Sequence, residues 1–170
     1  LWAIRHHVSE SLRQEGKVLA FDISVPRSCM AAFTQTARTL LAAEYPFVRC
    51  CDFGHWGDGG THLNLVWDEA TAPRPVTGLV PELQTRVYDL AVKGFEGSYS
   101  AEHGVGPHNQ RFYAAYTPSV IRALSGALKR HLDANGILGV VATVPDAAPG
   151  CRYELSLAAD VVLVEQYHTD

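Results

Sequence analysis

The apolar residues between positions 17 and 101 follow a sequence of spacings that few folds accommodate. Alternating apolar residues predict strands and spacings of three and four predict helices, in the chain order 17–25 (strand), 27–44 (helix), 47–53 (strand), 61–67 (strand), 79–95 (helix) and 98–101 (strand). The order β-α-β-β-α-β is that of ferredoxin-like folds. We therefore expect an α+β fold in which both helices cover one face of an antiparallel sheet.

Further helices are predicted on both sides of this block. Apolar residues at helical spacing indicate a helix over 1–15, and a C-terminal helix is expected over 118–132. Since a domain holds about 150 residues, the length of 170 residues predicts a single domain. The chain begins with Leu in a predicted helix, without an initiating Met, so we expect it to be a piece of a larger protein.

The composition argues against several classes of partner. With 14 Lys and Arg against 18 Asp and Glu the formal net charge is −4, so no overall positive field attracts a nucleic acid. No apolar run reaches the roughly 20 residues of a membrane-spanning helix, and the first residues lack the layout of a signal peptide. We therefore expect a cytoplasmic protein with no membrane span and with its four cysteines reduced.

Two glycine-rich turns carry the residues best suited to chemistry. The first turn, 54–60, joins two predicted strands, so a hairpin brings His55 and His62 to the same end of the sheet. The second turn follows the last predicted strand and begins with Glu102 and His103. Two imidazoles and a carboxylate suit a divalent metal such as zinc or manganese with open positions for a substrate. The alternative is that these histidines simply cap the turns.

The two turns together resemble a known family. Their sequences are GHWGDGGTHLN (54–64) and GSYSAEHGVG (97–106), and the similarity extends to LWAIR (1–5), DISVP (22–26) and LDANGIL (132–138). These motifs resemble the C-terminal domain of FAD-linked oxidases of the vanillyl-alcohol oxidase superfamily. The resemblance implies that this domain covers residues 1–145, and it gives no role to the tail 146–170. That superfamily includes D-2-hydroxyglutarate dehydrogenases, D-lactate dehydrogenases and the flavin subunit of glycolate oxidase.

The resemblance implies an FAD-linked oxidoreductase that oxidises a small D-2-hydroxy acid to the 2-oxo acid. FAD would be bound mainly by an N-terminal domain of the same polypeptide, because no nucleotide-binding glycine motif occurs in these residues. The expected partners are the hydroxy acid, the upstream FAD-binding domain and a second copy in a homodimer. No nucleic acid is expected.

The resemblance also implies roles for individual residues. The metal ligands would be His55, His62 and Glu102. The substrate-binding residues would be Arg5, which would grip the substrate carboxylate, Ser9, Asn64 and His103. His103 would also be catalytic, as the base that takes the proton of the 2-hydroxyl.

Some positions depart from the family pattern. Ala20 stands where the hydroxyglutarate enzymes carry a lysine for the second carboxylate, which favours a monocarboxylic substrate such as lactate or glycolate, or a larger apolar one. Asn109 and Ala142 replace residues that are usual in the family. These departures support a second interpretation: a ferredoxin-like module that has lost catalysis and binds a metal or a small acid, or mediates dimerisation.

Overall fold

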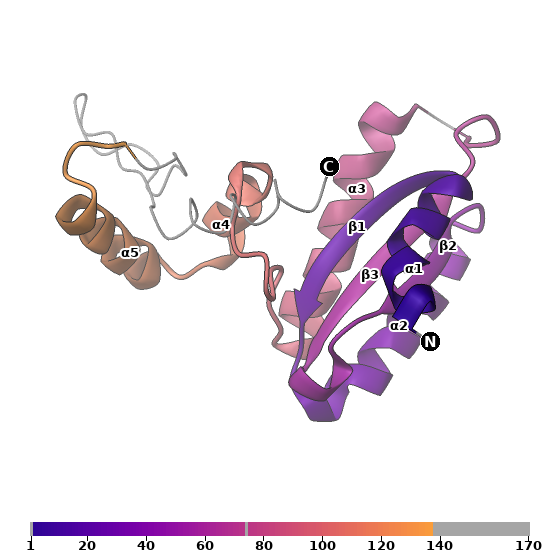
Figure 1. Ribbon diagram of the computed structural model, residues 1–170, viewed down its shortest axis with the longest axis horizontal. Coiled ribbons are helices and arrows are strands. Elements are labelled where there is room, and N and C mark those ends of the chain that lie inside the picture. The colour runs from indigo at the N-terminus through magenta and orange to yellow at the C-terminus, as the bar shows by residue number, and fades with distance from the viewer. Residues whose placement is uncertain (1, 74, 138–170) are drawn as a thin grey trace. The chain divides into compact units, whose positions relative to one another are not determined.

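A three-stranded antiparallel sheet forms the centre of the region that contains His55 and His62. Its strands are β1 (Lys17–Ser24), β2 (Arg49–Phe53) and β3 (Gly60–Trp67), with β3 in the middle (Figure 1). The computed structural model describes residues 2–73 and 75–137, and its contacts divide the chain into two compact units, Leu1–Ala101 and Glu102–Asp170. The sheet belongs to the first unit.

Three helices accompany the sheet in the first unit. They are α1 (Trp2–Gln14), α2 (Met30–Glu44) and α3 (Val76–Asp89). A short 3₁₀ turn, Arg27–Cys29, leads into α2, and a π turn, Leu90–Gly94, continues α3. In Figure 1, α1 crosses in front of the sheet, whereas α2 and α3 lie behind it. The predicted α+β fold class is thereby confirmed.

One face of the sheet forms the hydrophobic core with α2 and α3. Alternate residues of β1 and β3 point to that face, and they are almost completely buried: Phe21, Ile23, Leu63 and Leu65. The buried residues of the helices lie at helical spacing: Phe33, Ala37 and Leu41 in α2, and Leu79, Leu83 and Val87 in α3. Burying one such large side chain stabilises the fold by about 1.5–3 kcal/mol. The period-2 and period-3.6 patterns therefore meet in one core, as the sequence predicts.

The predicted strand 98–101 is present as a single antiparallel bridge between Ser24 and Ser98, beside β1. This position completes the ferredoxin-like neighbour order, with the last strand next to the first. The pairing stops after one residue because Ser98 Oγ donates to the Ser100 carbonyl at 2.7 Å and accepts its N–H at 3.2 Å. Such local side-chain bonds compete with a strand ladder.

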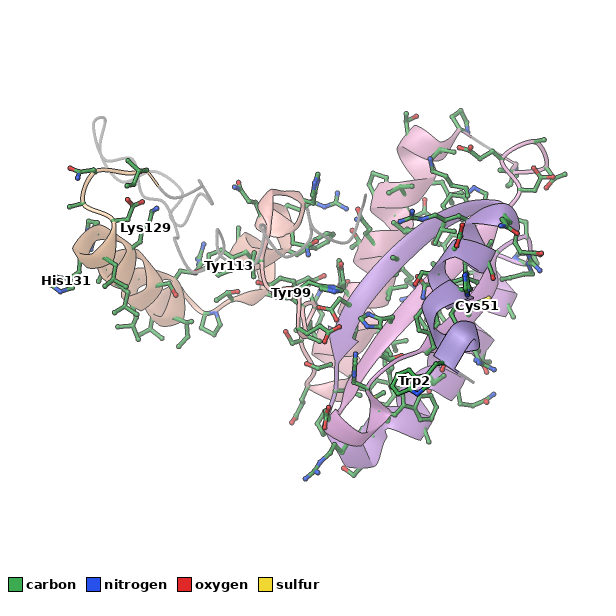
Figure 2. All side chains as sticks on the ribbon, viewed as in Figure 1. Trp2, Cys51, Tyr99, Tyr113, Lys129 and His131 are labelled. Atoms are coloured by element: carbon green, nitrogen blue, oxygen red, sulfur yellow. The ribbon has the colours of Figure 1, made fainter. Side chains whose placement is uncertain are left out.

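The second unit contains two helices in its described part. These are α4 (Gln110–Tyr116), which follows a 3₁₀ turn, and α5 (Ser119–Leu132), which matches the predicted C-terminal helix. Lys129, labelled in Figure 2, forms a buried ion pair with Asp133 at the end of α5. Asp133 Oδ1 also accepts the Ile137 N–H at 2.9 Å, so one carboxylate closes the helix end.

Two predictions fall outside the described residues. They concern Ala142 and the tail 146–170. Of the helices described in residues 2–73 and 75–137, none has the length and apolar character that crossing a membrane requires.

Candidate functional site

The glycine-rich turn between β2 and β3 has a closely bonded backbone. The carbonyl of His55 accepts the N–H of Asp58 at 2.8 Å and that of Gly60 at 3.1 Å. Gly59 has φ +88°, and a Cβ added there would lie 2.6 Å from the Val25 carbonyl oxygen. A side chain at this position would therefore be strained by its φ and would also clash. The glycines thus permit a tight turn that returns the chain directly into β3.

The turn brings His55 and His62 together at one end of the sheet. Their ring centroids are 5.4 Å apart at an interplanar angle of 79°, and imidazole nitrogens of the two residues lie within 4.8 Å of each other. The His62 side chain is 20% exposed. Two nitrogen donors can share one cation when they lie this near to each other and are partly accessible to solvent.

A carboxylate that the sequence analysis missed lies beside this pair. Asp22 of β1 is the direct cross-strand partner of His62. Its Oδ1 lies 3.8 Å from His62 Nδ1, and its Oδ2 accepts the Ala101 N–H at 3.0 Å. The available signal was Asp22 itself, a charged residue between the apolar Phe21 and Ile23. Its period-2 position puts it on the face opposite the core.

Asn64 occupies the same face of β3, two residues from His62. Its side chain is buried, and its Nδ2 donates to the His62 carbonyl at 2.9 Å. The register places Ala20 on one side of Asn64 and Cys51 on the other. Cys51, labelled in Figure 2, is therefore a second residue of this face that the sequence analysis did not single out. Directly paired residues share a face, so Asn64 lies between two small uncharged side chains.

The remaining predicted site residues lie on other elements. Arg5 and Ser9 belong to α1, where Ser9 is exposed and the side chain of Arg5 falls outside the described part. Glu102 and His103 begin the second unit, where His103 Nε2 lies 3.7 Å from Glu102 Oε1. The structure thus brings together His55, His62 and Asn64, and the roles of all seven residues stay predictions.

The ionisable groups on the opposite, helix-covered face of the sheet form other interactions. Arg38 of α2 donates from Nε to Asp52 Oδ1 at 3.1 Å, and this hydrogen bond, with the charge of the carboxylate, raises the pKa of Arg38. Burial raises the pKa of the Cys50 thiol to about 11. Cys29, Cys50 and Cys51 are free thiols. The charged Asp52 and the thiol of Cys50 are therefore directed away from the face that carries His62 and Asn64.

Comparison with known proteins identifies relatives along most of the chain. The family described as FAD linked oxidases, C-terminal domain, matches residues 1–140. A mitochondrial D-2-hydroxyglutarate dehydrogenase of Danio rerio is 35% identical over 146 residues, which are 86% of this chain and 26% of that protein.

Similar proteins occur in other organisms. A D-2-hydroxyglutarate dehydrogenase of Xanthomonas citri pv. viticola is 31% identical over 81% of this chain and 29% of its own length. The D-2-hydroxyglutarate–pyruvate transhydrogenase of Saccharomyces cerevisiae is 33% identical over 81% of this chain and 28% of its own length. The chain therefore spans between a quarter and a third of the length of these curated relatives.

Proposed function

Because this chain belongs to the family of FAD-linked oxidase C-terminal domains, we propose that it forms the substrate side of a flavin-dependent dehydrogenase for a small D-2-hydroxy acid. The observation that carries this proposal is the position of His62 and Asn64 on the sheet face that α2 and α3 leave free, with His55 of the adjoining turn beside His62. That face offers two metal-binding nitrogens and an amide beside them. The relatives that match over more than 80% of the chain are named as enzymes of 2-hydroxyglutarate.

The donor atoms of this face fit a divalent cation. The nitrogens of His55 and His62 suit zinc or manganese, and Glu102 would supply the carboxylate that the family resemblance implies. The segment that ends at Ala101 lies beside the turn that carries His55: a Cβ built on Gly60 would lie 3.6 Å from His55 Cβ and 4.0 Å from Ala101 Cβ. When bound, such a cation polarises the 2-hydroxyl of the substrate and makes its proton easier to remove.

The chain's own residues would bind the substrate and move one proton. Arg5 would hold the substrate carboxylate through charge-assisted hydrogen bonds from its guanidinium group. The Nδ2 of Asn64 is engaged by the His62 carbonyl, which leaves its Oδ1 to accept a hydrogen bond from the substrate hydroxyl. His103 would take the hydroxyl proton as a general base. FAD, bound by the rest of the polypeptide, would supply the acceptor for the hydride of C2.

Ala20 supports a substrate with one carboxylate. It is exposed on β1 and is the direct partner of Asn64 across the β1–β3 pair, so its methyl group stands beside the amide that would contact the substrate. A methyl group cannot pair with a second carboxylate. We therefore propose lactate, glycolate or a larger apolar 2-hydroxy acid as the substrate, rather than the dicarboxylate for which the relatives are named.

Metal content tests the histidine pair directly. The chain is purified without chelator and analysed for zinc and manganese beside a His55→Ala/His62→Ala variant. A His108→Ala/His131→Ala variant is the matched control, because both of its imidazoles are exposed on the second unit. We expect about one ion per chain in the wild type and the control, and almost none in the site variant. Equal metal in all three proteins would contradict the proposed site.

Activity measurements test the proposal that this chain binds the substrate while another part of the polypeptide binds FAD. The chain alone is expected to purify without colour. Dye-linked oxidation of D-2-hydroxy acids is expected when it is joined to the flavin-binding domain of a relative, and His103→Gln should abolish that turnover. A yellow preparation of the chain alone with stoichiometric flavin would refute the proposed division. The cytoplasmic location and the homodimer remain part of the proposal.

A further inference from the structure

Asp22 joins two segments that both border the proposed metal site. One oxygen of its carboxylate faces the imidazole of His62 across the β1–β3 pair, with 3.8 Å between Oδ1 and Nδ1. The other oxygen accepts the N–H of Ala101 at 3.0 Å, from a segment 79 residues further along the chain. The Asp22 side chain is only 13% exposed, so solvent screens these interactions little.

We propose that Asp22 is a positioning residue of the metal site: its carboxylate sets the tautomer and ring orientation of His62 and anchors the segment that ends at Ala101. This inference rests on the proposed function, since it assigns a partner to a histidine of the proposed site. Metal-binding histidines in proteins almost always direct their second ring nitrogen to such an acceptor.

The charge of Asp22 favours one of the two neutral tautomers of His62. A carboxylate can only accept hydrogen bonds, so the proton is favoured on Nδ1, which faces it. The lone pair is then on Nε2 and is available to a cation. The negative charge also makes the imidazole a stronger donor to that cation.

The bond to Ala101 has a separate consequence. Backbone pairing between this segment and β1 ends at the bridge of Ser24 and Ser98, so no strand ladder holds Ala101. The carboxylate of Asp22 supplies the hydrogen bond instead. One side chain thus fixes both His62 and the residue that precedes Glu102.

The test uses the 170-residue chain and the variant Asp22→Asn. Asparagine has almost the same shape and can still accept the Ala101 N–H through its oxygen, but it then turns an NH₂ donor toward His62 Nδ1. Asp52→Asn is the matched control, because Asp52 is also a β-strand carboxylate with a buried side chain, yet it lies on the helix-covered face and pairs with Arg38. Zn²⁺ affinity is measured by calorimetry, and the tautomer of His62 is read from its ring ¹⁵N shifts in metal-free protein.

In the wild type we expect the Nδ1–H tautomer of His62. In Asp22→Asn we expect the Nε2–H tautomer and Zn²⁺ binding weaker by about 10- to 100-fold. Asp52→Asn should lower the urea midpoint while leaving both the tautomer and the Zn²⁺ affinity unchanged.

The failures of the two proposals can be told apart. Wild-type protein that binds no Zn²⁺ would overturn the metal site, and the tautomer measurement would still decide whether Asp22 orients His62. Zn²⁺ bound equally by wild type and Asp22→Asn, or a His62 tautomer unaffected by Asp22→Asn, would overturn the positioning role alone.

Discussion

Replacing Gly97 by alanine should separate the last segment of the first unit from β1. A Cβ built on Gly97 would lie 2.3 Å from the Ser24 carbonyl oxygen, 2.7 Å from Val25 Cγ1 and 3.0 Å from the Ala91 carbonyl oxygen. Two of these three neighbours are backbone atoms, which cannot rotate away as the end of a side chain can. The segment must therefore move by roughly 1 Å to reach ordinary contact distances.

The energetic cost follows from the hydrogen bonds that such a movement breaks. Ser24 N–H donates to the Ser98 carbonyl at 3.2 Å, Ser98 N–H to the Ser24 carbonyl at 2.7 Å, and Gly97 N–H to the Ala91 carbonyl at 2.9 Å. At about 0.5–1.5 kcal/mol for each net hydrogen bond, the loss of all three lowers the free energy of unfolding by about 1.5–4.5 kcal/mol. The same movement shifts Ala101, so Zn²⁺ affinity should fall as well.

The assay is urea unfolding followed by far-ultraviolet circular dichroism, with Gly78→Ala as the control. Gly78 lies in α3, and an added Cβ there meets nothing within 4 Å. Because alanine is the better helix former, that variant should gain up to about 1 kcal/mol. A Gly97→Ala protein within about 0.5 kcal/mol of the wild type would refute the reasoning, because the clash would then be relieved without breaking the bridge.

Three further outcomes are expected. The first concerns Ala20→Lys in the chain joined to a flavin-binding domain. The ratio of kcat/KM for a dicarboxylic 2-hydroxy acid to kcat/KM for lactate should rise by about 10- to 100-fold, since an ammonium group would then pair with the second carboxylate. An unchanged ratio would contradict the role of position 20. Phe33→Ala should lower the unfolding free energy by about 3–5 kcal/mol in urea titrations, because Phe33 is fully buried and its ring packs edge-on against Phe95 at 5.5 Å, whereas Phe33→Leu should lose much less. Because burial raises the pKa of Cys50 from 9.0 to about 11, its alkylation by iodoacetamide at pH 8 should be slow, with about 0.1% thiolate, and should accelerate up to pH 11. Since the folded chain holds this proton more tightly than the unfolded chain, stability should fall as the pH rises from 9 to 11; fast alkylation at pH 8 would show that the thiol is not buried.

The sequence alone was sufficient to predict the elements of the first unit and the closeness of two histidines in it, whereas the helix α4 of the second unit was not predicted. Apolar spacing is a local property, and it identified the strands and helices of the first unit because each buries one face. Glycines on both sides of His55 predicted a tight hairpin turn, which is why the closeness of His55 and His62 followed from residues only seven positions apart. The family motifs likewise depend on residue types and short spacings, so the match over residues 1–140 was foreseeable.

Only the tertiary structure decided which residues lie beside the histidines on the neighbouring strand and segment. The pairing of Asp22 with His62 joins positions 40 residues apart, and the bond from Asp22 to Ala101 joins positions 79 apart. Strand register depends on contacts between faces that meet only after folding, and a period-2 pattern specifies which face a residue occupies but not which residue it meets there. The last predicted strand is likewise reduced to one bridge by contacts that the pattern does not specify. The hydroxyl of Ser98 bonds to the backbone of Ser100 in place of a strand ladder, and the carboxylate of Asp22 accepts the N–H of Ala101.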